Sequence, residues 1–402
     1  FHLPIVTDDL HTFMQSFQGD IFGTALNDAK PFNERKYTEQ RTDKTQNYAN
    51  HDSPPLSGNS NCTGETLFTT AKLFFGLDSK TSTNCKIALD KKDEIAQQFY
   101  NDKINGQHKV DVLLGGGSKY FGKENGHLTE KFQKDGYDYV TNKTDLANSK
   151  SDQVLGLFAE KNMPLQIDAP QQNPLLADME ESALSKLEKN DKGFFLMVEG
   201  ASIDKSGHPN DITGVMSEMS GFDKAFQNAI DYAKNHKDTL VVATADHSTG
   251  GLSIAKGKDY VWNPDAIHKM KHSGSYMTEQ IAKGKDPETV INEGYGVDFP
   301  KKQLDKVKDA AKELKDVKDK AKNEDDPKIA EATTQLQDAI QKPINDESHT
   351  GWTTYGHTGE DVNTYAYGPG ADKFRGNIDN TDSAKNIFDF FGQDVTSNQN
   401  QQ

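Results

Sequence analysis

Acidic and histidine side chains stand in this sequence where apolar runs end. In VEGASIDKSGHPND, Glu199 closes an apolar run, and Asp204 and His208 follow four residues apart. In a helix, residues at i and i+4 lie on one face, so this pair can hold one metal ion. Taken alone, such a pair is more often a surface ion pair. The chemistry indicated is metal binding, provided that further ligands join the pair.

A second pair of candidate ligands, Asp246 and His247, ends the run DTLVVATADH, and His357 stands in a glycine-flanked turn. Neighbouring strand residues point to opposite faces, so Asp246 and His247 reach one metal only where the strand breaks. The small residues STGG that follow provide such a break. Together with Asp204 and His208, these residues make five candidate ligands, which is more than one tetrahedral zinc ion can bind. Two neighbouring metal ions are predicted, the arrangement used for in-line displacement at phosphorus.

The elements that must position these residues form a strand-helix-strand unit. Residues 193–201 and 238–247 contain apolar runs without polar alternation, which is typical of strands covered on both faces. Residues 214–236 between them carry apolar side chains at helical spacing. This order predicts a βαβ unit of a parallel sheet, with its ligands at the carboxyl ends of the strands. The run LLGGG lacks the Lys and Ser/Thr of a P-loop and predicts a tight turn after a strand.

The predicted fold class is α/β, with a central, mostly parallel sheet flanked by helices and a charged helical insertion. A chain of 402 residues can form one large domain with insertions or two domains. We expect one domain over 1–402, an insertion at about 256–348 and a frayed tail at 394–402. Residues 301–340 are rich in Lys, Asp and Glu and are broken near Pro327. They are interpreted as a solvated helical insertion rather than a partner-binding coil.

Composition excludes two classes of partner. The net charge of -16 and the pI of about 5.2 argue against nucleic acid, which needs clustered Lys and Arg. No run approaches the roughly 20 apolar residues of a membrane helix, so no membrane span is predicted. Cys62 and Cys85 form one disulfide or remain two thiols, and their spacing does not decide. The chain begins with Phe1, which suggests the mature form of an exported protein.

Three motifs together resemble a known family. VEGASIDKSGHPND, ATADHSTGG and GHTGEDVNTYAYGPG are similar, in this order, to the metal-binding segments of bacterial alkaline phosphatases. Residues 107–393 resemble the secreted staphylococcal-type enzymes throughout. The resemblance implies a secreted or periplasmic homodimer with an alkaline-phosphatase-like fold. It also implies hydrolysis of small phosphate monoesters through a phosphoserine intermediate, with two zinc ions and one magnesium ion.

The resemblance also assigns roles to individual residues. Asp204, His208 and His357 would hold the first zinc ion. Asp246 and His247 would hold the second, and Glu199 would serve magnesium.

The N-terminal family motifs are not intact here, and their replacements are proposed from position. Asp8, after the apolar run PIV, is the candidate for the family's bridging Asp, and Ser53 in NHDSPPLSG is the candidate nucleophile. In FTTAKLFFGLDSK, Thr69 or Thr70 would be the magnesium-ligating Thr, with Thr70 taken as the candidate, and Lys80 would replace the phosphate-gripping Arg. A Lys is a point charge, so a weaker phosphate grip follows. The alternatives are a turn serine before Pro54 for Ser53, and a helix cap or turn for Asp8.

Three other functions compete with the phosphatase. A related phosphodiesterase or phosphonate esterase would share the zinc ligands, and a degenerate metal-binding protein would bind zinc without turnover. A mutase is disfavoured because family mutases work intracellularly with a different cap. His272 and His349 are expected to have loop-surface or hydrogen-bonding roles, and Trp352, near His357, to wall the site.

Overall fold

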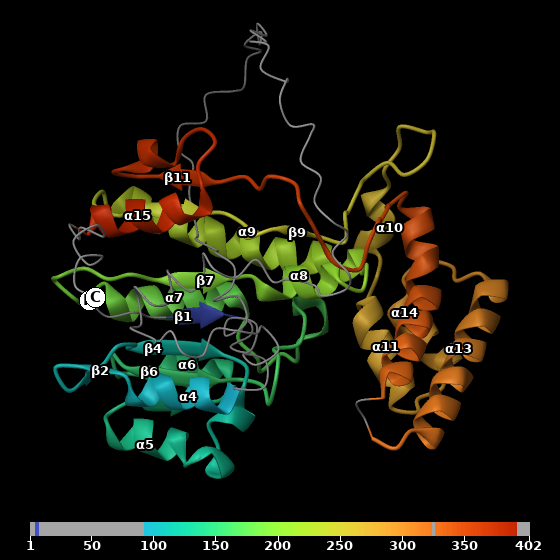
Figure 1. Cartoon of the computed structure of the whole chain (residues 1–402), viewed down its shortest axis with the longest axis horizontal. Helices are drawn as coiled ribbons and strands as arrows, with labels where there is room; N and C mark the ends of the chain where they lie inside the picture. Colours follow the sequence, from blue (N-terminus) through green and yellow to red (C-terminus); the bar gives the residue numbers. More distant parts are fainter. Residues whose placement is uncertain (1–4, 8–91, 324–325, 392–402) are drawn as a thin grey trace, which may run out of the picture.

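The computed structural model describes residues 5–7, 92–323 and 326–391 (Figure 1). Both cysteines, the N-terminal site candidates and the C-terminal tail lie outside the described residues. These are Asp8, Ser53, Cys62, Thr69, Thr70, Lys80, Cys85 and residues 394–402.

A five-stranded sheet lies at the centre of the described fold. Its strands run in the order β5-β6-β4-β1-β7, and each neighbouring pair is parallel. They are β1 (Ile5–Thr7), β4 (Val112–Gly115), β5 (Asp138–Val140), β6 (Val154–Leu157) and β7 (Met197–Glu199). The predicted α/β class with a mostly parallel central sheet is therefore confirmed.

Helices cover this sheet because its central strands are apolar on both faces. In β4, Leu113 packs into one core with α4 and α5, whereas Val112 and Leu114 pack into a second core with α7 and α9. All three side chains are at most 1% exposed. The helices around the strands are α4 (Lys92–Asn101), α5 (Leu128–Lys134), α6 (Lys143–Asn148), α7 (Leu176–Leu187), α8 (Ala201–Gly207), α9 (Ile212–Asn235) and α15 (Asn380–Phe390).

One prediction about the sheet is wrong. The strand after α9, β8 (Val241–Ala243), does not pair with the five-stranded sheet within the described residues. It pairs antiparallel with β11 (Tyr365–Tyr367), in the register Val242 with Ala366. The run of Val and Ala signals a buried strand, but it carries no information about which strand supplies the hydrogen bonds.

Two short antiparallel pairs are the remaining strands of the described residues. β2 (Lys103–Ile104) pairs with β3 (Gln107–His108), and β9 (Ser248–Thr249) pairs with β10 (His357–Thr358), both antiparallel. After β4, Gly117 adopts φ 96° and begins a 3-10 turn, which fits the tight turn predicted for LLGGG.

A group of helices lies beside the sheet and its covering layers, and we call it the helical body (Figure 1). It comprises α10 (Pro264–His268), α11 (Gly274–Ala282), α12 (Pro287–Gly294), α13 (Lys301–Lys320) and α14 (Pro327–Glu347). Met277, Leu314, Leu336 and Ile340 are at most 1% exposed within its core. Pro327 is the first residue of α14. A backbone N–H at this position makes no hydrogen bond within the helix, so a proline is tolerated there.

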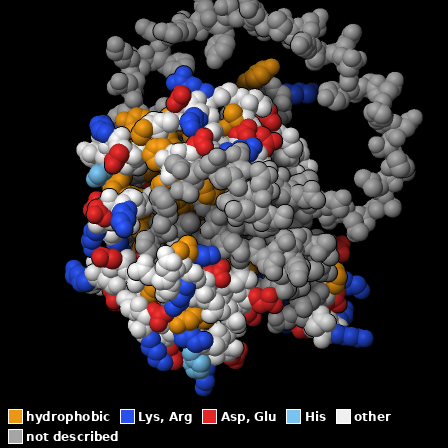
Figure 2. Space-filling model, turned by 60° about the vertical axis from the view of Figure 1, so that its left-hand side comes forward, with side chains coloured by type: hydrophobic (Ala, Val, Ile, Leu, Met, Phe, Trp, Pro, Cys, Tyr) orange, Lys and Arg blue, Asp and Glu red, His pale blue; other side chains and the backbone are white. Residues whose placement is uncertain are grey.

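The surface carries charges of both signs. Acidic and basic side chains are interspersed over the face seen in Figure 2. Of the helices in the described part of the chain, none combines the length and apolar character needed to cross a bilayer.

Candidate metal centre

The turn after β7 places Asp204 and His208. β7 ends at Glu199, Gly200 follows, and α8 carries Asp204 in its first turn with His208 as its C-terminal cap. A Cβ at position 200 would lie about 3 Å from side-chain atoms of Phe222 and Ile203, so glycine lets these two side chains pack closely against the turn into α8. The helical turn then puts the two ligand candidates on one face.

A two-stranded pairing brings His357 to the same place. β10 lies antiparallel to β9, with His357 opposite Thr249 and Thr358 opposite Ser248. The Ser248 hydroxyl also hydrogen-bonds with Thr358 and Glu360, which ties the two strands together through their side chains. The histidine therefore reaches α8 from a distant part of the chain.

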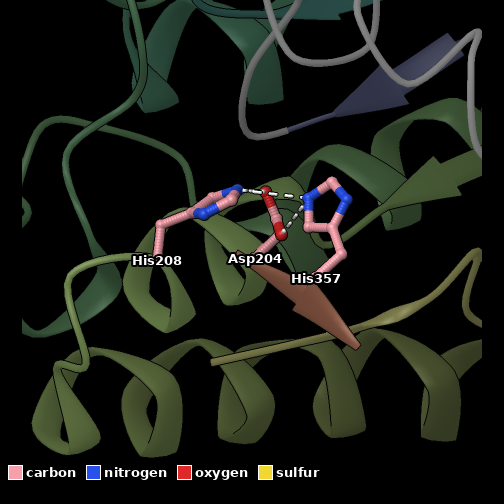
Figure 3. Close-up of side chains that lie close together, drawn as sticks. All are labelled: Asp204, His208 and His357. Carbon is pink, nitrogen blue, oxygen red and sulfur yellow. Dashed lines mark hydrogen bonds and ion pairs between the residues drawn. The ribbon is translucent and has the colours of Figure 1, made fainter. Parts of the chain in front are cut away.

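Asp204, His208 and His357 converge, with the carboxylate lying between the two imidazole rings (Figure 3). Nε2 of His208 lies 3.4 Å from Oδ2 of Asp204, and Nε2 of His357 lies 3.7 Å from Oδ1. The two Nε2 atoms are 3.3 Å apart. Two imidazole nitrogens and one carboxylate are the ligand set of catalytic zinc sites, which keep a further position open. The residues present therefore fit a zinc ion.

Asp246 and His247 lie against this cluster. Both follow the end of β8 and precede β9, so the strand alternation that would separate their side chains does not apply. Nε2 of His247 lies 3.0 Å from Oδ2 of Asp246. The rings of His247 and His357 stack with their centroids 3.5 Å apart. The second predicted ligand pair is thus adjacent to the first group.

Hydrogen bonds orient the ligand candidates. Nδ1 of His208 lies 2.6 Å from the Tyr355 carbonyl oxygen and donates its N–H to that oxygen, so Nε2 is the ring nitrogen that faces Asp204. The Thr249 hydroxyl donates to Oδ1 of Asp204 at 2.5 Å and lies 3.3 Å from Nδ1 of His247. Such partners around ligands fix ring tautomers and carboxylate orientation.

Neighbouring charges set the protonation of these groups. Burial acts to raise the pKa of Asp204, but hydrogen bonds from His208 and Thr249 outweigh it and hold that pKa below its usual value. Asp204 in turn raises the pKa of His208. Burial lowers the pKa of His357, and the adjacent His247 adds to this effect. The carboxylate therefore stays ionised among imidazoles, which is the state in which it attracts a cation.

Glu199 is the last residue of β7, directly before the turn into α8. Its side chain is 1% exposed, and its backbone pairs with Thr7, the last residue of β1. The candidates Asp8, Ser53, Thr70 and Lys80 lie outside the described residues.

Thr249 and Tyr355 were missed by the sequence reasoning. Thr249 belongs to the STGG turn, which the sequence indicated only as a break in the strand. Tyr355 acts through its backbone carbonyl, and a backbone group cannot be identified from the type of residue. Among the other histidines, His272 hydrogen-bonds through Nδ1 to Asp168 at 2.8 Å, which matches its expected hydrogen-bonding role.

Replacing Thr249 with Val is expected to weaken zinc binding about tenfold, because Val keeps the shape and removes the hydroxyl that orients Asp204. Competition against a chromogenic zinc chelator measures the affinity. Thr333→Val is the matched control, since its hydroxyl bonds only within α14, to the carbonyl of Ile329. Equal zinc affinity in the Thr249 variant and the unmodified chain would contradict this role.

Comparisons with known proteins agree in pointing to one family. A family model described as alkaline phosphatase matches residues 77–392. Alkaline phosphatase 3 of Bacillus subtilis is 46% identical over 296 residues, which cover 74% of this chain and 61% of that protein. Alkaline phosphatase of Escherichia coli is 36% identical over 213 residues, covering 44% of each chain. The chain therefore spans about three fifths of the length of the Bacillus relative.

A solved structure is similar as well. The crystal structure of a cold-active alkaline phosphatase from the psychrophile Shewanella sp. superposes with a TM-score of 0.63 and 34% identity. The match covers 75% of this chain and 69% of that one.

Proposed function

Because the chain belongs to the alkaline phosphatase family, we propose that it is a metal-dependent hydrolase of small phosphate monoesters. The observation that carries the proposal is the convergence of Asp204, His208 and His357 beside Asp246 and His247. Two clustered ligand sets suit displacement at phosphorus, where charge neutralisation and positioning matter more than covalent chemistry.

We further propose how the ligands are divided. Asp204, His208 and His357 would hold one zinc ion, and Asp246 with His247 would hold a second. Glu199 would serve magnesium together with Asp8 and Thr70. Support for Asp8 comes from sequence, since it directly follows β1, whose last residue pairs with Glu199. When bound, these ions supply positive charge that neutralises phosphoryl oxygens and acidifies an attacking hydroxyl.

In this proposal the chain's own residues carry the covalent step. The Ser53 hydroxyl gives its proton to water and its Oγ attacks phosphorus in line, while the bond between phosphorus and the alcohol oxygen breaks and the departing alkoxide takes a proton from water and leaves as the alcohol. Water then hydrolyses the phosphoserine and releases inorganic phosphate. Lys80 would hold phosphoryl oxygens with a single charge. Detection of a labelled phosphoserine in the unmodified chain, and its loss in Ser53→Ala, tests this step.

The metal requirement gives the direct test of the function. We expect turnover of p-nitrophenyl phosphate to fall to background after chelation and to return when zinc and magnesium are added. Metal analysis of the same samples gives the bound ions. Zinc binding without turnover of any monoester would contradict the proposed function and favour a degenerate metal-binding protein. Preference for bis(p-nitrophenyl) phosphate would favour a diesterase.

The family resemblance also supports a secreted or periplasmic homodimer. Light scattering after gel filtration tests the dimer, and cell fractionation tests the location.

A further inference from the structure

The helical body reaches the metal centre through the segment that follows α14. After α14 the chain passes α8 on its way to β10 and β11 (Figure 1). Tyr355 lies on this segment, two residues before the ligand candidate His357. Its backbone carbonyl oxygen accepts the Nδ1–H of His208, and its hydroxyl donates to Oδ2 of Asp338 on α14 at 2.8 Å. One residue therefore contacts a ligand candidate and the helical body at the same time.

The peptide group between Tyr355 and Gly356 is held on both of its edges. Its carbonyl oxygen accepts from His208 at 2.6 Å, and its N–H donates to the Thr354 hydroxyl at 3.0 Å. The carbonyl of Gly356 in turn accepts from the N–H of Gly250 at 2.8 Å. The direction of the Tyr355 carbonyl is thus set by the neighbouring backbone on one side and by the Tyr355 side chain on the other.

The ring orientation of His208 depends on this carbonyl. A carbonyl oxygen can only accept, so the bond requires a proton on Nδ1 and directs Nε2 towards Asp204, 3.4 Å away. Nε2 is therefore the atom that would bind zinc together with Asp204 and His357. Partners of the second ring nitrogen fix the orientation of histidine ligands, and losing one typically weakens metal binding by about 10–100-fold.

The helical body also holds the backbone that follows His208. Oδ2 of Asp211 accepts from the N–H and the hydroxyl of Ser275 on α11, both at 2.9 Å. Nδ2 of Asn345 on α14 lies 3.4 Å from the carbonyl oxygen of Asn210. Asp211 is 1% exposed, so its bonds are shielded from water. With the backbone fixed in this way, the freedom that remains at this ligand candidate is rotation of its ring.

We propose that Asp338 and Tyr355 are positioning residues through which the helical body fixes the zinc ligand His208. The proposal rests on the zinc site of the proposed function and adds a role to the insertion, which was interpreted from its sequence as a solvated helical segment. Asp338 restrains the Tyr355 side chain, and the Tyr355 carbonyl then holds the imidazole in the orientation that zinc needs. Both residues act through His208 and not on the phosphoryl group.

The zinc affinity of the full chain, measured by competition with a chromogenic chelator, tests Tyr355. Tyr355→Phe removes only the hydroxyl, and we expect it to weaken zinc binding about fivefold. The effect should stay below that of losing a direct ligand partner, because the carbonyl remains and the Tyr355 side chain is 49% exposed to competing water. Tyr260→Phe makes the same change at a fully exposed side chain and should leave the affinity unchanged.

Variants of the carboxylate identify the route from α14. Asp338→Ala should weaken zinc binding as much as Tyr355→Phe, and the double variant should weaken it no further, because both changes remove the same hydrogen bond. Asp338→Asn keeps an oxygen that accepts from the Tyr355 hydroxyl and should retain the affinity. Glu331→Ala removes an exposed carboxylate elsewhere on α14 and is the matched control. Additive losses in the double variant, or equal losses in Asp338→Asn and Asp338→Ala, would overturn the proposal.

A packing variant separates positioning from a general loosening of the helical body. Leu336→Ala removes buried methyl groups from the core face of α14 and leaves both partners of the bond between Asp338 and Tyr355 in place. It should keep the zinc affinity of the unmodified chain under conditions in which the variant is folded. A loss equal to that in Tyr355→Phe would show that zinc binding follows the stability of α14, and the positioning role would be refuted.

Zinc affinity and turnover of p-nitrophenyl phosphate fail independently of each other. If the chain binds zinc but hydrolyses no monoester, the proposed function fails while the zinc comparisons still decide the positioning role. If the chain binds zinc and hydrolyses the ester, but Tyr355→Phe has the affinity of the unmodified chain, the positioning role alone is refuted.

Discussion

Asp204→Ala is expected to lower kcat/KM for p-nitrophenyl phosphate by about a thousandfold or more and to release one of two bound zinc ions. Its carboxylate lies between His208 and His357 and is the acidic member of the proposed ligand set. A bound ion contributes several kcal/mol of charge stabilisation in the transition state, and each 1.36 kcal/mol is about a factor of ten in rate. Removing the carboxylate also leaves two imidazoles 3.3 Å apart without the charge that draws a cation between them.

Metal analysis and steady-state kinetics measure both effects on the same preparation. Asp223→Ala on α9 is the control, because it removes an exposed carboxylate away from the ligand cluster. It should keep both zinc ions and full turnover. If Asp204→Ala keeps full activity and both ions, the assignment of this ligand set is wrong, whatever the family of the chain.

Local spacing in the sequence was informative where one element holds the residues concerned. The i and i+4 relation of Asp204 and His208 needs only a single helical turn, and α8 provides it. The break after β8 that frees Asp246 and His247 from strand alternation is likewise a local property of the turn residues. The helix at 214–236 and the break near Pro327 correspond to α9 and to the start of α14.

Pairing between distant segments was not predictable in the same way. His357 meets Asp204 because β10 pairs with β9, and nothing in GHTG specifies that register. The partner of β8 was assigned wrongly for the same reason, since an apolar run is compatible with any neighbouring strand. Tyr355 contributes a carbonyl group, which every residue has.

Leu336→Ala is expected to lower the free energy of unfolding by about 2–5 kcal/mol. Leu336 is fully buried in the core of the helical body, so the substitution removes methyl groups and leaves a cavity between packed helices. The matched control is Leu304→Ala on α13, where the side chain is only partly buried and the loss should be clearly smaller. Denaturant titration gives both values from the transition midpoint and slope.

The same titration tests whether the chain unfolds as one domain. Trp262 and Trp352 both pack against the core of the helical body, so their fluorescence reports that part, whereas far-UV circular dichroism reports every helix and strand. Our expectation of a single domain over 1–402 requires the two transitions to coincide, and Leu336→Ala should move both together. A shift confined to fluorescence would show that the helical body unfolds by itself. An unchanged midpoint by both probes would mean that Leu336 does not support the core of the helical body.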